Sequence, residues 1–441
     1  MEEQVKNDLI DIIKNLSPLE KEEDIKERKH HLTEFLKTGF PNKRMEDWKF
    51  SDLKQIISSN IKELKFFDNN LDNAEYDQSN ILNFEHNKII FTNGLVSKID
   101  FCHEEKARFE VMHNITETNT KKISRLHHGN EFANTYVDGR SYETEEKNPL
   151  ILLNNGLKFT HIRLQVKKNY EFKKPLVVYN FTNQKLKSTA INLRFDVELK
   201  ENSFLKMINL FNDDSDNNFI NINHQYKICD NAVLKNYKID HKNNSNIKYF
   251  YNNIDLGKNS IAENFIFSTG SKFLKNEINC NLNDEYSSAF INGILNLKES
   301  KHHEIKTNIN HRAANTKSYQ LVKSVLNDNS KGVYQGKIYV SRNAQKTDGY
   351  QLSKALLLSE NTEFDAKPEL EIYADDVKCS HGSTSGNLDE EAIFYFMSRG
   401  LNYKQSRELL INGFLLDVVE KITDSEIKDL IKNIMGIKEW V

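Results

Sequence analysis

The chain has 441 residues, which is enough for about two to four domains and a large core. Its 61 Lys and Arg residues against 64 Asp and Glu residues leave a net charge of -3, so no global field would draw it to nucleic acid or to an anionic membrane. The cysteines lie far apart and form no CxxC pair, which argues against a disulfide framework and against a four-thiolate metal site within this chain.

No stretch approaches the roughly 18 apolar residues that a membrane span requires. Ala392 to Met397 is among the longest unbroken apolar runs and is far too short. The N-terminus is acidic and amphipathic, without the basic start and apolar middle of a signal peptide. We therefore expect a cytoplasmic protein.

The first forty residues show helical periodicity. Apolar residues share one face from Val5 to Leu16, a Ser-Pro pair interrupts the pattern, and it resumes from Ile25 to Leu36. The pattern predicts an N-terminal helical region, which we bound at 1–95.

The apolar period then changes from helical to alternating. Runs at 191–199, 220–228 and 278–282 predict half-buried strands, separated by polar turns such as 212–218. The recurrence of strand-like clusters suits the stacked turns of a solenoid, but the pattern fits a large sandwich or jelly roll equally well. We bound this all-β block at 96–384.

After Ser385 the helical period returns and predicts a small C-terminal helical domain over 385–441. Three residue pairs have the spacing of a capping box and predict three helix starts, and Gly400 stands where the first helix would stop. The three pairs are Asn387 with Glu390, Asn402 with Gln405, and Thr423 with Glu426.

The second of these helices carries an apolar stripe with a period of four residues. The stripe either packs onto the β block or forms a ridge that docks a partner. It consists of Leu410, Phe414, Val418 and Ile422.

Common enzyme signatures are missing. The nearest approach to a phosphate-binding loop, residues 332–338, has one residue too few between its glycines and no Ser or Thr after Lys337. His303-Glu304 begins a zinc-protease pattern but lacks the second histidine. We therefore expect a chain that is not an enzyme and binds no nucleotide by itself.

Cys379 and His381 form the one segment with metal-ligand character. They are two residues apart, so in an extended segment both side chains point to one face, where a thiolate and an imidazole can share a metal. Two ligands cannot complete a zinc or iron-sulfur shell, so further ligands must come from elsewhere. A purely structural pair and a Cys-His nucleophile pair stay open as alternatives.

Other candidate ligands are scattered over the β block. Each is expected to be a side chain of a solenoid turn, and Cys280, which alternates with two apolar residues, is expected to point inward. These residues are His302, His303, His311, Cys229 and Cys280.

At both ends the sequence resembles a known family. Residues 344–419, which contain KPELEIYADDVKCSHG and FYFMSRG, resemble the C-terminal signature of the SufD branch of the SufB/SufD family of iron-sulfur cluster assembly proteins. Residues 40–50, with the run MEDWKF, resemble its N-terminal motif, and Phe91 to Gly94 is similar to a strand-turn found there.

This resemblance implies a right-handed parallel β-helix core between the two helical regions, and so favours a solenoid over a sandwich. It implies a scaffold subunit of the SUF complex that pairs with SufB through the β-helix and docks the SufC ATPase through the C-terminal helices. We expect the SufC contact at Arg407, Leu410, Phe414 and Leu415. A homodimer of the isolated chain stays open.

The resemblance further implies that a transient iron-sulfur cluster, or iron, is shared with SufB. Of Cys379 and His381, it favours His381 as the ligand. Reduced flavin on the complex is an open point, and this chain is expected to bind no nucleotide.

Two alternatives remain. One is a purely structural or iron-supplying subunit that contributes no cluster ligand of its own. The other is a carbohydrate-active β-helix enzyme, which needs paired carboxylates on one face of the solenoid. The adjacent Asp375 and Asp376 disfavour it, because neighbours in a strand point to opposite faces.

Overall fold

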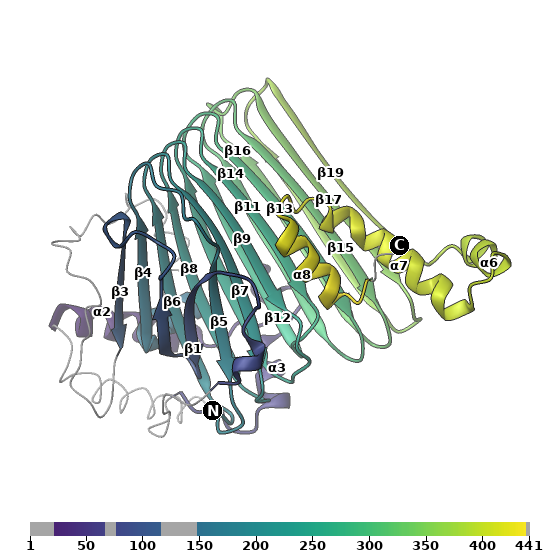
Figure 1. The fold of residues 1–441 in the computed structure, drawn as a ribbon, viewed down its shortest axis with the longest axis horizontal. Helices are drawn as coiled ribbons and strands as arrows, with labels where there is room; N and C mark the ends of the chain where they lie inside the picture. The colour runs from purple at the N-terminus through teal and green to yellow at the C-terminus, as the bar shows by residue number, and fades with distance from the viewer. Residues whose placement is uncertain (1–21, 67–75, 116–147, 438–441) are drawn as a thin grey trace. The chain divides into compact units, whose positions relative to one another are not determined.

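The computed structural model describes residues 22–66, 76–115 and 148–437. The protein is mainly β and forms a β-solenoid, which confirms the expected fold class and excludes the sandwich (Figure 1). Two compact units are present, one formed by Met1–Leu234 with Asn244–Asp255 and the other by Lys235–Asn243 with Leu256–Val441. The helix expected from Val5 to Leu16 lies outside the described residues. The boundaries at 95/96 and 384/385 stay predictions.

Helices of the first unit include the one expected from Ile25 to Leu36 and a fully buried apolar helix, α5. Asn148 caps α5 by accepting a hydrogen bond from the Leu150 amide, and Pro149 takes its first turn, where its missing N–H costs nothing. These helices are α2 (Glu22–Thr38), η1 (Glu46–Trp48), α3 (Leu53–Asn60), η2 (Gln78–Asn80), η3 (Lys106–Arg108) and α5 (Pro149–Leu157).

Strands of the first unit form two sheets with the orders β7-β5-β1-β2 and β8-β6-β4-β3. Most neighbours are parallel, and the pairs β1/β2 and β3/β4 are antiparallel. The strands are β1 (Asn87–Thr92), β2 (Leu95–Asp100), β3 (Phe109–Ile115), β4 (Thr160–Val166), β5 (Leu176–Thr182), β6 (Ala190–Leu199), β7 (Phe204–Asp213), β8 (Phe219–Ile228) and β10 (Ile247–Leu256).

A two-residue turn joins β1 to β2. Asn93 and Gly94 both have positive φ, 52° and 82°, as the tight hairpin turns that suit twisted strands require. A Cβ atom on Gly94 would lie 2.6 Å from Cγ2 of Ile191, so glycine is also needed for close packing. This turn accounts structurally for the motif from Phe91 to Gly94.

The second unit continues the parallel pairing in two sheets, ordered β19-β17-β15-β13-β11 and β18-β16-β14-β12. Its strands are β9 (Val233–Asp240), β11 (Ile261–Ser268), β12 (Phe273–Leu282), β13 (Ser288–Leu297), β14 (His302–His311), β15 (Lys317–Leu326), β16 (Lys331–Val340), β17 (Thr347–Leu357), β18 (Glu363–Ile372) and β19 (Val377–Gly386).

Asparagines at the corners explain much of the Asn-rich composition. Asn169, Asn202 and Asn231 all have φ between 56° and 58°, a left-handed conformation that Asn tolerates better than most residues. Asn231 donates to Asn202 at 3.0 Å and Asn202 donates to Asn169 at 2.7 Å, so the corner amides of successive turns form a ladder. The Asn-rich turns are therefore structural.

Three helices follow β19: α6 (Glu390–Ser398), α7 (Tyr403–Val419) and α8 (Ser425–Ile434). Asn402 and Gln405 form the expected capping box of α7, and Gly400, with φ of 96°, ends the first helix as predicted. The other two cap assignments were wrong. Asp389 caps α6 and Asp424 caps α8, because in each case an aspartate lies closer to the first turn and accepts its amide hydrogens.

The apolar stripe of α7 packs onto the solenoid. Val418 of the stripe is fully buried, as is Leu415 next to Phe414, and α7 lies against β13 and β15. Lys323 of β15 fixes the helix, since its ammonium donates to Asp417 Oδ2 at 2.5 Å and to the Phe414 carbonyl at 2.6 Å. Of the two roles open to the stripe, contact with the β block is the one the structure has. None of the helices in the described ranges is long and apolar enough to cross a membrane.

Charged residues are buried between β12 and β14. Lys275 Nζ lies 2.9 Å from Glu304 Oε2, and two residues further along Lys306 Nζ lies 2.8 Å from Glu277 Oε1. Burial by itself raises the pKa of Glu304, but Lys275 and His302 outweigh it and hold the pKa below the usual range. Each charge therefore depends on its partner in the neighbouring turn.

Glu304→Gln should lower the free energy of unfolding by about 3 to 5 kcal/mol, because it leaves the Lys275 ammonium buried without its carboxylate. Denaturant unfolding followed by circular dichroism measures this. Glu34→Gln, which breaks an exposed pair with Lys37 on α2, is the control and should change stability little. Equal effects of the two substitutions would contradict the assignment.

Two buried histidines are held neutral. His303 Nδ1 lies 2.8 Å from Ser268 Oγ, and its Nε2 lies 2.7 Å from the Ser271 carbonyl oxygen. The ring of His311 lies between the hydroxyls of Thr316 and Ser318, at 2.7 and 2.8 Å. Burial lowers the pKa of both histidines to about 4.

The unfolding free energy should therefore fall as the pH drops from 7 to 5. An unfolded histidine titrates near pH 6.5, so in this window the unfolded chain binds protons that the folded chain refuses, at up to about 1.4 kcal/mol per pH unit for each group. Denaturation midpoints at several pH values measure the slope. His303→Gln removes one proton site and should reduce the slope; an unchanged slope would show that His303 does not contribute.

Candidate functional site

Cys379 and His381 lie on β19, side by side on one face. The parallel register places Cys379 opposite Gly349 and His381 opposite Gln351 of β17. As expected, both side chains point to one face of the strand. The pair lies near the start of the strand, since regular pairing continues from Cys379 for seven more residues to Gly386.

The face that they share is the inner one. A Cβ atom on Gly349 would lie 3.4 Å from Cys379 Sγ, 3.5 Å from Ser318 Oγ and 3.6 Å from His311 Nε2. Cys379 also packs against a buried core cluster that includes Ile338 and Val340. The thiol therefore projects toward the interior of the solenoid, beside groups that the preceding turns bury.

Burial raises the pKa of the Cys379 thiol above its usual value, and a hydrogen bond from the Gly349 backbone offsets only part of this effect. At neutral pH the thiol is protonated, and a metal must displace that proton before sulfur can bind it. Cys379 is thus poorly prepared as a nucleophile, which disfavours the Cys-His nucleophile pair.

His381 differs because its side chain is exposed. Behind it, Gln351 belongs to a buried polar chain in which the Tyr334 hydroxyl lies 3.2 Å from Oε1 of both Gln320 and Gln351. A Cβ atom on Gly336 would come within 2.1 Å of that Gln351 oxygen, so a larger residue there would displace the Gln351 side chain. These hydrogen bonds hold Gln351, the neighbour of His381 on β17, in place. The imidazole of His381 itself stays exposed to an outside ligand.

The donor set of this chain is incomplete for a metal. Within residues 22–66, 76–115 and 148–437, no three His, Cys, Asp or Glu side chains come together in a way that suits a metal ion. One thiol with a raised pKa and one exposed imidazole are too few to complete a metal shell.

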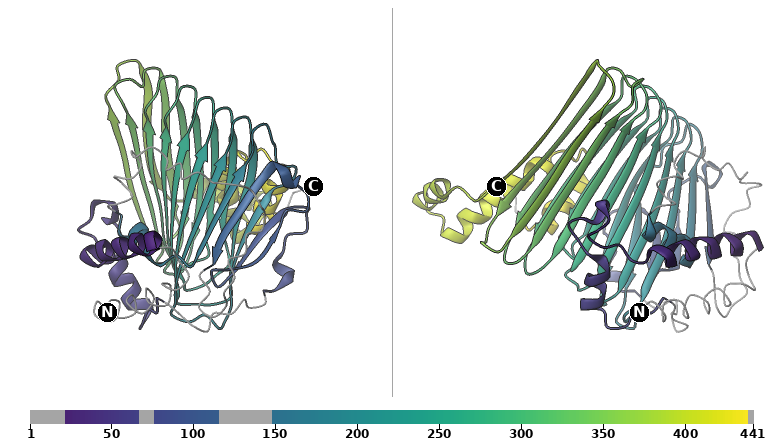
Figure 2. Two further views of the ribbon diagram at one scale, coloured as in Figure 1. Left: turned by 90° about the vertical axis from the view of Figure 1, so that its left-hand side faces the viewer. Right: turned by 180° about the vertical axis from the view of Figure 1, so that it is seen from behind.

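The pair lies on the last turn of the solenoid. β18 and β19 are the edge strands of the two sheets of the second unit (Figure 2). Most of their residues are exposed or half-buried. Ile372 and Tyr373, where β18 ends, are 37% and 54% exposed. The turn that carries Cys379 and His381 is therefore open to another molecule.

The remaining candidate ligands are side chains of the solenoid turns. Cys280 is buried between Ile278 and Leu282, as expected, and His303 and His311 are the buried histidines described above. His302 lies 2.9 Å from Glu304, and burial raises the pKa of the half-buried Cys229.

The segment 332–338 lies inside β16, so it cannot cradle a phosphate at a helix start.

The residues expected to bind a partner differ in their access. Leu415 is buried against the solenoid, whereas Leu410 and Phe414 are half-buried. Phe414 lies under the Lys323 ammonium, 4.5 Å from its ring centroid, and the Arg407 guanidinium lies 5.7 Å from the Tyr403 ring. Leu415 is thus part of the contact that fixes α7 and is not accessible to a partner.

A more exposed apolar surface lies on α6 and at the start of α7. We call it the α6 aromatic surface. The run from Ala392 to Met397 carries its signal in the sequence, but we considered that run only as a membrane segment. The surface consists of Phe394, 73% exposed, Tyr395, 53%, Met397, 43%, and Tyr403, 47%.

The position and the pKa of the carboxylates near the last turn argue against a carbohydrate-active enzyme. Asp375 and Asp376 lie in the turn between β18 and β19, not in a strand, so the argument from their strand positions was wrong. The outer face of β18 does carry several carboxylates. Hydrogen bonds from Lys331 and Lys337 lower the pKa of Glu363 and Glu371, whereas a general acid needs a raised pKa.

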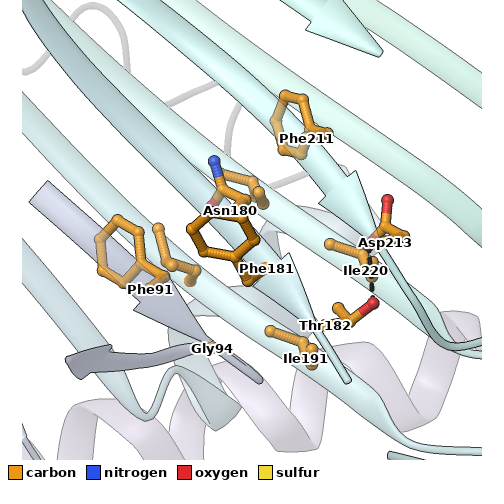
Figure 3. Close-up of a pocket in the computed structure, with 11 residues that line it drawn as sticks. Phe91, Gly94, Asn180, Phe181, Thr182, Ile191, Phe211, Asp213 and Ile220 are labelled. Atoms are coloured by element: carbon orange, nitrogen blue, oxygen red, sulfur yellow. Dashed lines mark hydrogen bonds between the residues drawn. The ribbon is translucent and has the colours of Figure 1, made fainter. Parts of the chain in front are cut away.

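A cavity inside the first unit is mainly apolar (Figure 3). Phe91, Phe181 and Phe211 form much of its wall. Its carboxylate, Asp213, accepts a hydrogen bond from Thr182 at 2.9 Å and pairs with the buried Lys248. The Asp213 carboxylate is therefore paired within the fold.

The N-terminal motif is a packing element. Glu46 to Trp48 form the short helix η1, and Trp48 is 2% exposed. Its ring lies 5.7 Å from that of Tyr249 on β10.

Comparisons with known proteins agree with these observations. Residues 181–414 match the family described as SUF system FeS cluster assembly, SufBD core domain. The iron-sulfur cluster assembly protein SufD of Escherichia coli is 26% identical over 402 residues, which cover 90% of this chain and 89% of that protein.

Shorter matches involve plant and cyanobacterial proteins. The chloroplastic protein ABCI7 of Arabidopsis thaliana is 44% identical over 78 residues, 18% of this chain and 16% of that protein. An iron-sulfur cluster assembly SufBD family protein of Synechocystis is 46% identical over 67 residues, 15% of each chain. With the family match spanning more than half of the chain and the SufD alignment nearly all of it, the chain belongs to the SufBD family of the SUF iron-sulfur cluster assembly system, and its resemblance to SufD is confirmed.

Proposed function

We propose that the chain is the SufD-type scaffold subunit of a SUF complex, pairing with SufB and docking the SufC ATPase. The observation that carries this proposal is the incomplete ligand pair, Cys379 and His381, on an open last turn. A nascent cluster or iron is the cargo of the assembly, and the missing ligands come from SufB. Of the two residues His381 is the better ligand, since its imidazole is exposed while the Cys379 thiol has a raised pKa.

ATP hydrolysis belongs to the partner SufC. The phosphate-loop-like segment of this chain is part of β16, which supports a subunit that hydrolyses no ATP itself. The C-terminal helices supply the docking surface for SufC, and the exposed α6 aromatic surface is its best-suited part, because clustered exposed aromatics are typical of contact sites. We place the whole complex in the cytoplasm.

A second role is a purely structural or iron-supplying subunit with no cluster ligand. The raised pKa of the Cys379 thiol favours this second role, because a metal binds the thiolate and not the thiol. The two roles predict different cluster contents for a complex that lacks the His381 imidazole.

His381→Ala should abolish most of the cluster on the SufB-containing complex and leave the complex itself intact, because it removes a ligand from an exposed position. Cys379→Ala should cost less. Anaerobic reconstitution followed by visible absorption measures the cluster, and size-exclusion chromatography checks the complex. Equal cluster content in the His381→Ala and wild-type complexes would leave this chain as a structural subunit.

Phe394→Asp should weaken copurification of SufC at least about tenfold, because it places a charge in the α6 aromatic surface. Tyr286→Asp is the matched control, since Tyr286 is an exposed aromatic residue, 52% exposed, at a solenoid corner. SufB binding and the circular dichroism spectrum should be unchanged in both variants. Retention of SufC by Phe394→Asp would remove the α6 aromatic surface from the contact.

A further inference from the structure

The residues that lie beneath Cys379 and His381, one turn earlier in the solenoid, differ in kind. We propose that Gln351, whose amide is fixed from two sides, is a positioning residue that holds the His381 imidazole up in the open last turn. The inference rests on the proposed function, which makes that imidazole a ligand for iron or a cluster. It deepens that function by assigning the residue that presents the ligand.

The parallel register defines what lies beneath each candidate ligand. Side chains in register on neighbouring strands are about 4.8 Å apart. On the inner face, Cys379 therefore lies over Gly349, and His381 lies over Gln351. Gly349 has no side chain, and a Cβ atom there would lie 3.4 Å from Cys379 Sγ. The thiol thus rests directly on this glycine and reaches the interior of the solenoid.

Gln351 fills the corresponding position beneath His381 with a side chain that is held from two sides. Its Oε1 lies 3.2 Å from the Tyr334 hydroxyl, and its Nε2 donates to the Glu369 carbonyl at 3.2 Å. Tyr334 belongs to β16 and Glu369 to β18, so the side chain reaches from β17 to the opposite sheet. An amide held in this way cannot swing aside to admit the imidazole.

A buried polar chain extends from this amide into the preceding turns. The Tyr334 hydroxyl lies 3.2 Å from Gln320 Oε1, which accepts a hydrogen bond from Thr307 at 2.6 Å. Burying polar groups costs free energy unless hydrogen bonds compensate for it. An apolar side chain also fits this column, since Ile291 lies one turn before Gln320. Packing alone therefore does not require a glutamine at position 351.

Gly336 on β16 leaves the space that the amide of Gln351 needs. A Cβ atom on Gly336 would lie 2.1 Å from Gln351 Oε1 and 2.5 Å from the Tyr334 hydroxyl oxygen. Both distances are much shorter than a van der Waals contact, so a larger residue would push these groups away. A substitution of Gly336 can therefore displace the amide without changing Gln351 itself.

The access to each candidate ligand follows from the residue beneath it. The Cys379 side chain over the glycine is half-buried, whereas the His381 side chain over the fixed amide is exposed, although both point to the inner face. An imidazole that is supported from below loses less conformational freedom when it binds a metal. Residues that orient a metal ligand in this way contribute to the metal affinity without touching the metal.

Carbethoxylation of the full chain by diethyl pyrocarbonate measures access to the imidazole. In the tryptic peptide 379–399, His381 is the one histidine. Gln351→Ala should lower its reaction rate at least about threefold, in proportion to the fraction of molecules in which the ring stays exposed. Gln320→Ala, the same substitution one turn earlier, is the matched control and should leave the rate unchanged, since both groups that hold Gln351 remain. Equal rates in Gln351→Ala and wild type, or equal losses in both variants, would overturn the inference.

Gly336→Ala tests the same role without removing an amide. It should lower the rate at His381, because the new Cβ atom displaces Gln351. Gly332→Ala on the same strand is its control, since a Cβ atom there would meet the flexible end of Leu326 at 3.0 Å. Circular dichroism checks that each variant is folded. A folded Gly336→Ala variant with the wild-type rate would contradict the positioning role.

Iron(II) titration of the SufB-containing complex separates this inference from the proposed function. Gln351→Ala should weaken iron binding about 10- to 100-fold, as the loss of a residue that orients a metal ligand does, and Gln320→Ala should not. If Gln351→Ala binds iron as the wild type does while His381→Ala binds more weakly, the positioning role is wrong and the proposed function stands. If the wild type binds iron no better than His381→Ala, the imidazole is not a ligand, and both the ligand assignment and this inference are wrong.

Discussion

The parallel hydrogen-bonding register is the constraint on which the rest of the structure depends. Each strand can satisfy its N–H and C=O groups only by lying in register with the strands one turn before and one turn after it. The same register aligns asparagines into corner ladders and buried lysines with glutamates. It also ensures that the last turn ends with main-chain groups that lack a neighbour in the same sheet.

The edge strands of the sheets differ between the two units. In the first unit the antiparallel strands β2 and β3 lie at the sheet edges, whereas in the second unit the edges are the parallel strands β18 and β19. Only β18 has proline and a row of charges to protect it. Cys379 and His381 lie on β19, the edge strand that has neither feature.

Apolar side chains of the C-terminal helices fall into a buried set on α7 and an exposed set on α6 and at the start of α7. Val418 and Leu415 bind α7 to the solenoid, and Lys323 secures it through Asp417. The α6 aromatic surface, by contrast, is exposed. A substitution at Leu415 would therefore test folding before it tested binding.

The sequence by itself determined the β-strand runs, the helix start at Asn402, the stop at Gly400 and the shared face of Cys379 and His381, because local periodicity and turn chemistry are enough for these. Alternation alone left the solenoid and the sandwich open, and the resemblance to SufD decided between them. Only the tertiary structure showed that Leu415 is buried, that His381 is exposed while burial raises the pKa of the Cys379 thiol, and that Pro368 lies on an edge strand. These properties depend on which strand lies beside which, and that is set by contacts between residues a full solenoid turn apart.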